Sequence, residues 1–259
     1  MNLQFLGAAR QVTGSQYCVT VGEQRILIDC GQYQEHALKG RNWEPFAVDP
    51  KTIDAVLITH AHIDHCGLLP KLVRDGFNGL IYTTGASAEL LDIVLRDAAH
   101  IQKEDAEMKQ RRHEKEGRRV PHPVAPLFTI EDVEQTLPLV REIDYSAPFK
   151  PIDGLSAVFH DAGHILGSAM VDLTYRVDGK AGRLVFTGDI GQSDRPIIND
   201  PTILTEADYL VMESTYGDRD HAAPAGADPH DPFDTAGQLA DYINQTYERG
   251  GNVVIPTFA

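Results

Sequence analysis

The stretch THAHIDHCG, residues 59–67, places three histidines and one aspartate within six consecutive positions, directly after an apolar run that predicts a strand. Alternate residues of an extended chain point to the same side, so His60 and His62 can face one cation. Asp64 and His65 fall where the chain is expected to turn into a helix, and they can face a second cation. Imidazole and carboxylate groups are the ligand types that suit zinc, and also manganese or iron. The stretch therefore predicts a metal site at a strand end.

Three other segments carry the same residue types where predicted strands end. FHDAGHILGSA brings His164 into a glycine-flanked loop, LVFTGDIG places Asp189 beside a glycine, and RILIDCG ends its strand in Asp29. Glycine allows the backbone to approach an ion closely. Each segment alone has an ordinary interpretation as a turn, but together with the histidine run they predict a shared site.

The overall composition is that of an ordinary soluble globular protein. The chain has 259 residues, of which 42% are hydrophobic and 24% are charged. No apolar stretch approaches the roughly 20 residues of a membrane-spanning helix, so no membrane partner is expected. The start MNLQFLG lacks the features of a secretory signal, and three cysteines are too few for a disulfide framework. These features predict a cytoplasmic protein.

The formal net charge of −15 would repel a polyanion unless basic residues or bound cations act locally. The segment KQRRHEKEGRR (109–119) gathers six lysines and arginines in this otherwise acidic chain. A solvated helix end is the favoured interpretation of such a charge run, and a contact surface for phosphates is the alternative. Bound divalent cations, together with this segment, would answer the objection that the net charge raises to a nucleic acid substrate.

The order of the predicted elements indicates a layered α/β protein. The predicted strands lie at about 2–6, 16–21, 25–29, 53–59, 80–84, 156–160, 170–177 and 183–188, and the predicted helices at 67–76, 86–117 and from Thr129 onward. Strands, then helices, then strands again favour stacked layers over a barrel of regular βα units.

The pattern changes in the last fifth of the chain. DYLVMEST (208–215) predicts a buried strand, FDTAGQLADYINQTYERGG (233–251) a helix, and NVVIPTFA (252–259) the start of another buried strand. A buried strand that stops without a partner is typical of a chain cut short. We therefore expect a main domain over 1–206 and the incomplete beginning of a second over 207–259.

Taken in order, the candidate ligands resemble the pattern of the metallo-β-lactamase fold superfamily, an αββα sandwich that holds one or two metals at a sheet edge. The segments GAARQVTGS, LIDCG, HAHIDHCGLLPKL, AGHILGSA, FTGDIG, ESTYGDR and GGNVVIPTFA further resemble the β-CASP subfamily of RNA-processing nucleases. This resemblance covers essentially the whole chain. It implies the sandwich for the first domain and the beginning of a β-CASP cap for the second.

The resemblance also implies a role for each candidate residue. One zinc ion would be bound by His60, His62 and His164 and a second by Asp64 and His65, with Asp189 bridging the two ions. Asp29 would support the ligands from behind, as carboxylates commonly do at histidine metal sites. Asp64 could in addition position or deprotonate the attacking water. Glu213 would be an acidic catalytic residue that partners a histidine expected farther along the chain.

The implied activity is the hydrolysis of RNA. Two metal ions about 3.5 to 4 Å apart lower the pKa of a bridging water toward about 7 and stabilise charge on the attacked phosphate. We therefore expect a zinc-dependent ribonuclease that cleaves single-stranded RNA endonucleolytically, 5′-to-3′ exonucleolytically or both, as a homodimer or within an RNA-processing complex. The alternatives are a small-thioester hydrolase of the glyoxalase II kind and a non-catalytic scaffold of an RNA-processing complex.

Two side chains near these motifs have two interpretations each. Cys66 could ligate zinc, but a small buried thiol is the favoured interpretation. Trp43, with Tyr33 and Phe46 nearby, could stack on bases. Packing beneath the RNWEPF loop is the favoured interpretation of this tryptophan.

Overall fold

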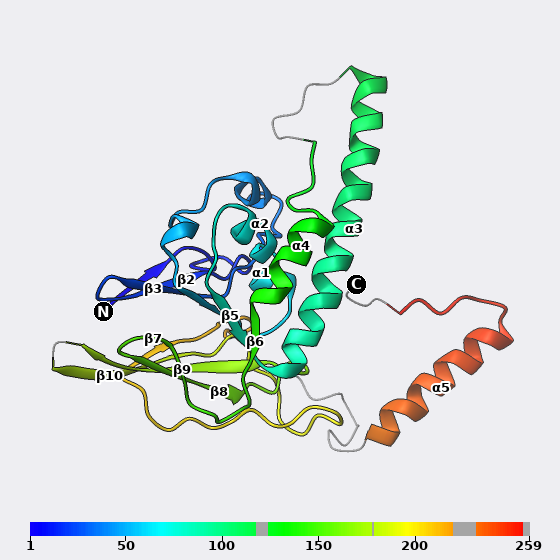
Figure 1. Ribbon diagram of the computed structural model, residues 1–259. Helices are drawn as coiled ribbons and strands as arrows, with labels where there is room; N and C mark the ends of the chain where they lie inside the picture. The colour runs from blue at the N-terminus through cyan, green and yellow to red at the C-terminus, as the bar shows by residue number, and fades with distance from the viewer. Residues whose placement is uncertain (118–123, 178, 220–231, 256–259) are drawn as a thin grey trace. The chain divides into compact units, whose positions relative to one another are not determined.

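The computed structural model describes residues 1–117, 124–177, 179–219 and 232–255, and the chain forms two compact units (Figure 1). The first unit comprises Met1–Ser193 and Ile198–Glu213, and the second comprises Asp194–Ile197 and Ser214–Ala259. All candidate metal ligands lie in the first unit. The domain division expected after residue 206 stays a prediction.

The first sheet contains six strands in the order β1-β2-β3-β4-β5-β6. They are β1 (Asn2–Phe5), β2 (Tyr17–Val21), β3 (Gln24–Ile28), β4 (Ala55–Leu57), β5 (Leu80–Thr83) and β6 (Val140–Glu142). The first three pair antiparallel and form the predicted meander, with Gly22 at φ +63° in the two-residue turn between β2 and β3. From β3 to β6 the strands are parallel. The carboxyl ends of β3 and β4 therefore lie side by side at one edge of the sheet.

The second sheet contains five strands in the order β11-β10-β9-β8-β7. They are β7 (Phe149–Ile152), β8 (Leu155–Asp161), β9 (Ala169–Val177), β10 (Lys180–Phe186) and β11 (Tyr209–Val211). The pairs from β7 to β10 are antiparallel, and β11 runs parallel to β10. The β8–β9 connection and the chain after β10 are the two segments of this sheet that carry candidate ligands.

A buried apolar cluster joins the two sheets face to face. Alternate residues of the first sheet, such as Ile26 and Leu57, pack with Phe159, Val171 and Phe186 of the second, and each of these side chains is at most 1% exposed. Such alternation is what sheet-on-sheet packing requires, because successive side chains of a strand point to opposite faces. The cluster holds the ligand-bearing ends of both sheets in fixed positions.

The helices of the first unit cover the other face of the first sheet. They are α1 (Ile63–Cys66), α2 (Leu69–Arg74), α3 (Gly85–Glu116) and α4 (Ile130–Thr136). Leu91 and Leu95 of α3, together with Phe128, pack on Val56 and Ile81 of the sheet. Figure 1 shows α2, α3 and α4 gathered on this side. The predicted layered α/β fold is confirmed, and the described residues of the first unit form a helical layer and two sheets.

Helix α3 begins and ends with the expected capping residues. The Thr84 hydroxyl accepts a hydrogen bond from the N–H of Ser87, and Gly117 ends the helix at φ +60°. Buried positions recur every four residues up to Ala99, and beyond this residue the helix extends away from the sandwich (Figure 1). Only the first half of α3 therefore contributes to the core.

Two predictions about strands were wrong. DYLVMEST forms β11, but Tyr209 and Leu210 are 59% and 56% exposed instead of buried. β11 is an edge strand that pairs with β10 alone, and among its three residues Val211 is the one that packs, partly buried, against the cluster between the sheets. Residues 252–255 of NVVIPTFA form no strand and are exposed, and the rest of that segment lies outside the described residues.

The segment after Thr129 also differs from the prediction. The helix has the expected capping box between Thr129 and Asp132 but ends at Thr136, where a 3-10 turn (Leu137–Leu139) leads into the unpredicted strand β6. Pro138 has no N–H to donate and so does not continue an α-helix. The open edge of β5 then pairs with the chain that follows.

No described helix is both long and apolar enough to cross a membrane.

Trp43 lies at the end of a 3-10 helix (Lys39–Trp43) and is 37% exposed. Its neighbours are used in packing: the Tyr33 hydroxyl donates to the carbonyl of Leu6, and the Lys71 ammonium lies 4.0 Å from the centre of the Phe46 ring.

Candidate metal centre

The first sheet delivers the histidine run at its carboxyl edge. β4 ends at Leu57, the chain bends at Thr59, His62 is extended, and α1 begins at Ile63. The N–H of Cys30, just beyond β3, donates to the carbonyl of His65 at 2.7 Å. This hydrogen bond attaches the short helix α1 to the neighbouring strand end.

His164 comes from the second sheet, in the connection between β8 and β9. Its backbone N–H donates to the Ser168 hydroxyl at 3.0 Å. Two hydroxyls at the start of α3, those of Thr84 and Ser87, donate to the carbonyl of Gly167 at 2.6 and 2.8 Å. The loop that carries His164 is therefore held both by its own side chains and by the helical layer.

Asp189 follows β10 in the segment LVFTGDIG. Gly188 has φ +53°, and a Cβ atom at this position would lie 2.8 Å from the Cβ atom of Thr59. The N–H of Ile190 donates to the Glu213 carboxylate at 2.6 Å. Glu213 thus lies behind the Asp189 loop and holds its backbone. The catalytic role expected for Glu213 through a further histidine stays a prediction.

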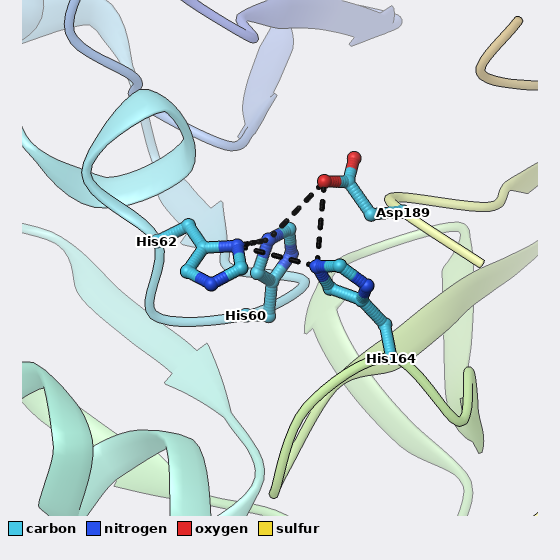
Figure 2. A group of neighbouring side chains, drawn as sticks. All are labelled: His60, His62, His164 and Asp189. Carbon is cyan, nitrogen blue, oxygen red and sulfur yellow. Dashed lines mark hydrogen bonds and ion pairs between the residues drawn. The ribbon is translucent and has the colours of Figure 1, made fainter. Parts of the chain in front are cut away.

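The side chains of His60, His62, His164 and Asp189 converge, as Figure 2 shows. The Nδ1 atom of His62 lies 3.0 Å from Nε2 of His60 and 3.2 Å from Nε2 of His164. One carboxylate oxygen of Asp189, Oδ2, lies 3.7 Å from Nε2 of His60 and 3.6 Å from Nε2 of His164. The four donor atoms lie within 4.8 Å of one another. Three imidazole nitrogens and one carboxylate oxygen are a donor set that fits zinc.

The other oxygen of Asp189 faces a different histidine. Oδ1 lies 3.2 Å from Nε2 of His65, and Oδ2 of Asp64 lies 3.9 Å from the same nitrogen. Asp189 therefore has one oxygen toward the first cluster and one toward His65, which is the arrangement that a bridging carboxylate requires. The assignment of Asp64 and His65 to a second ion stays a prediction.

Asp29 is buried beneath these ligands, at the end of β3. Its Oδ2 atom lies 2.8 Å from Nδ1 of His65, and its Oδ1 atom accepts the N–H of Thr59 at 2.8 Å. The Thr59 hydroxyl donates to Oδ2 of Asp29 at 2.9 Å and lies 3.0 Å from Nδ1 of His60. The sequence identified Asp29 but missed Thr59, whose signal is a hydroxyl residue directly before the first histidine.

Burial and charge set different protonation states on neighbouring imidazoles. Burial, followed by the effect of nearby imidazoles, lowers the pKa of His60 well below its ordinary value, and the pKa of His62 is lowered mainly by burial. Burial also acts to lower the pKa of His65, but Asp29 and Asp189 outweigh it and raise this pKa well above its ordinary value. His60 and His62 are therefore neutral near pH 7, as metal ligands must be.

The segment GAARQVTGS lies beside the site and is fixed by a residue that the sequence did not single out. The N–H of Ser15 donates to the carbonyl of Asp64 at 2.9 Å. The Glu35 carboxylate accepts the N–H groups of Val12 and Thr13 at 2.9 and 3.0 Å, and also the Thr13 hydroxyl. One carboxylate thus holds the loop that borders α1.

The sequence left two interpretations for Cys66, a zinc ligand or a small buried thiol. Cys66 is fully buried in the core between helices and sheet, and burial raises its thiol pKa well above the ordinary value. It is not part of the metal-ligand cluster found among the described residues. The geometry thus favours the buried thiol.

Two arginines of the basic segment on α3 are paired with acidic residues of the same helix. Arg111 lies 3.5 Å from Glu107, and Arg112 lies 3.0 Å from Glu116. Residues 118 and 119 lie outside the described residues. The pairing favours a solvated helix face over a surface for phosphates.

Comparisons with known proteins show the family of the chain. The chain matches the model of the metallo-beta-lactamase superfamily over residues 9–247. It is 38% identical to ribonuclease TTHA0252 of Thermus thermophilus, over 100% of this chain and 52% of the relative. It is 31% identical to transcription termination factor FttA of Methanocaldococcus jannaschii, over 100% of this chain and 37% of the relative. It is also 32% identical to an RNase J-like protein of the same organism, over 99% of this chain and 51% of the relative.

The chain thus spans about half the length, or less, of the curated relatives that it matches. Among solved structures, a B3 metallo-beta-lactamase with an active-site glutamic acid is 22% identical to this chain. The structural match covers 77% of this chain and 62% of that enzyme, with a TM-score of 0.44.

Proposed function

The chain belongs to the metallo-beta-lactamase superfamily, and on this premise we propose that it is the metal-binding part of a zinc-dependent ribonuclease of the β-CASP subfamily. The observation that carries the proposal is the convergence of His60, His62 and His164 on one oxygen of Asp189 while the other oxygen faces His65. The names of the relatives, a ribonuclease and an RNase J-like protein, support RNA as the substrate.

The residues would hold two zinc ions as their positions suggest. One ion would be bound by His60, His62 and His164. The other ion would be bound by Asp64 and His65, and Asp189 would contribute to both. When bound, the ions would activate a water molecule near neutral pH and offset the negative charge of the attacked phosphodiester. The donor set fits this role because zinc accepts both imidazole nitrogen and carboxylate oxygen.

The remaining residues would keep the ligands in place. Asp29 accepts the Nδ1 proton of His65 and so leaves Nε2 directed toward Asp189. Glu213 holds the backbone of the Asp189 loop through Ile190. The substrate would be single-stranded RNA in the cytoplasm, cleaved internally or from the 5′ end, by a homodimer or within an RNA-processing complex.

The test combines metal analysis with cleavage assays on this chain and on any longer form of the protein. Elemental analysis is expected to find zinc in the wild-type protein and less in the His60→Ala variant. A 5′-labelled single-stranded RNA is expected to be cleaved, and the product lengths distinguish internal from terminal cleavage. His100→Ala is the matched control, because His100 is an exposed histidine on α3.

Each alternative has its own outcome in the same assays. Turnover of a small thioester without RNA cleavage would support the glyoxalase II-like hydrolase. Bound zinc with neither activity would support the scaffold. Absence of zinc from the wild-type protein after incubation with it would refute the proposal as a whole.

A further inference from the structure

Thr59 makes more hydrogen bonds within the metal centre than its position in the motif suggests. We propose that Thr59 is a positioning residue whose hydroxyl keeps the proton of His60 on Nδ1 and thereby leaves Nε2 free to bind a divalent metal. The inference rests on the proposed function, because it concerns the same metal centre.

The geometry places Thr59 between two groups of the site. Its side chain is buried, with the residue 1% exposed. Its Oγ1 atom lies 2.9 Å from Oδ2 of Asp29 and 3.0 Å from Nδ1 of His60. On the opposite side of the His60 ring, Nε2 faces His62 and Asp189. The two ring nitrogens of His60 therefore have separate surroundings.

The direction of these hydrogen bonds follows from the number of protons available. A hydroxyl has one proton to donate, and an ionised carboxylate only accepts. The Thr59 proton therefore goes to Asp29, and Oγ1 is left to accept a proton from Nδ1 of His60. In a neutral imidazole, a proton on Nδ1 leaves a lone pair on Nε2.

The alternative arrangement would close the site. A proton on Nε2 of His60 could be donated to Nδ1 of His62, which lies 3.0 Å away. That hydrogen bond would occupy two of the donor atoms that converge on the metal position. Among the described residues, Thr59 is the hydrogen-bond partner of Nδ1 of His60, and without its hydroxyl this nitrogen has no other acceptor for its proton. We therefore expect this closed arrangement to gain population.

The structure also shows how to remove the hydroxyl alone. The backbone of Thr59 is held independently, because its N–H donates to Asp29 and its carbonyl accepts from Ala169 at 2.8 Å. Gly188 packs closely against the Thr59 side chain, so the shape of that side chain has to be kept. Valine has nearly the shape of threonine without the hydroxyl, whereas serine keeps the hydroxyl.

The experiment compares wild type, Thr59→Val and Thr59→Ser by zinc titration in competition with a chelator. We expect Thr59→Val to weaken zinc binding by about 10-fold or more and Thr59→Ser to stay within about 3-fold of wild type, since partners of metal-binding histidines typically contribute 10- to 100-fold to affinity. Thermal unfolding of each metal-free variant checks that the fold is kept. Equal affinity of Thr59→Val and wild type would overturn the inference.

A second readout uses the metal-free protein. Nitrogen-15 NMR of the histidine side chains is expected to show the His60 proton on Nδ1 in wild type and Thr59→Ser, and mostly on Nε2 in Thr59→Val. A wild-type His60 with its proton on Nε2 would overturn the inference even if Thr59→Val fails to fold. If wild type binds no zinc, the proposed function fails, whereas the position of the His60 proton still decides the role of Thr59.

Discussion

Replacement of Glu35 by glutamine is expected to destabilise the protein in a pH-dependent manner. Burial acts to raise the pKa of Glu35, but hydrogen bonds from Thr13 and Val12 outweigh it and lower this pKa from 4.5 to about 2. Such a lowering corresponds to about 3.4 kcal/mol of stability. Because the carboxylate is partly in contact with solvent, screening reduces this value to roughly 1.5 to 2 kcal/mol at pH 7.

The sign follows from the direction of the pKa change. The folded-state pKa of Glu35 lies below its unfolded value, so its contribution is fully present above about pH 4.5 and is lost as the pH falls through about 2. The Glu35→Gln variant cannot titrate at this position. The difference in unfolding free energy between wild type and variant should therefore shrink from about pH 5 downward.

Urea unfolding followed by circular dichroism, at several pH values from 7 to 3.5, measures this difference. Glu23→Gln is the matched control, because Glu23 is exposed in the turn between β2 and β3. The control should stay within about 0.5 kcal/mol of wild type, as surface substitutions usually do. A Glu35→Gln effect as small as the control's, or one that does not change with pH, would refute the reasoning.

Three further predictions concern the site and its surroundings. Gly188→Ala should lower the unfolding free energy by about 1 to 3 kcal/mol and weaken zinc binding. An alanine at φ +53° is strained, and its methyl would lie 2.8 Å from the Cβ atom of Thr59. Urea unfolding measures the first effect and zinc titration the second. Glu213→Ala should weaken zinc binding more than Glu213→Gln does, because the glutamine keeps an oxygen that can accept the Ile190 N–H. Zinc titration of both variants in competition with a chelator measures the two affinities. Equal affinities would contradict the role of Glu213 in holding the Asp189 loop. The Cys66 thiol, fully buried and with a raised pKa, should react with a thiol reagent only as fast as the protein unfolds, and rapid labelling in the folded state would contradict its burial.

The histidine run could be identified from the sequence because its ligand chemistry is local. His60 and His62 share a side of an extended segment, and this needs only the geometry of a strand. That His164 and Asp189 join them depends on how the second sheet packs on the first, which no local pattern encodes. Their positions at predicted strand ends made them candidates, the resemblance to a family gave their roles, and the structure brings both side chains to His60 and His62.

The hydrogen bonds that support the site and the exposure of β11 were harder to predict, because they depend on backbone groups and on the position of a strand at the edge of its sheet. Glu213 acts on the site through the N–H of Ile190, and a sequence does not show which backbone group a carboxylate will meet. The apolar residues of β11 predict burial, but burial also needs a covering element, and in the described first unit Val211 is the one residue of this edge strand that packs against the core. Local propensity is therefore informative about an element and less so about its surroundings.

The split of the ligands between the two sheets has a consequence for synthesis of the protein. Chains fold from the N-terminus as they are made, and His60, His62 and His65 precede His164 by about a hundred residues. A nascent chain would therefore offer a metal ion only a partial set of the candidate donors until Asp189 has emerged from the ribosome. Completion of the site would coincide with the closing of one sheet on the other, so that metal uptake reports the moment at which the sandwich assembles.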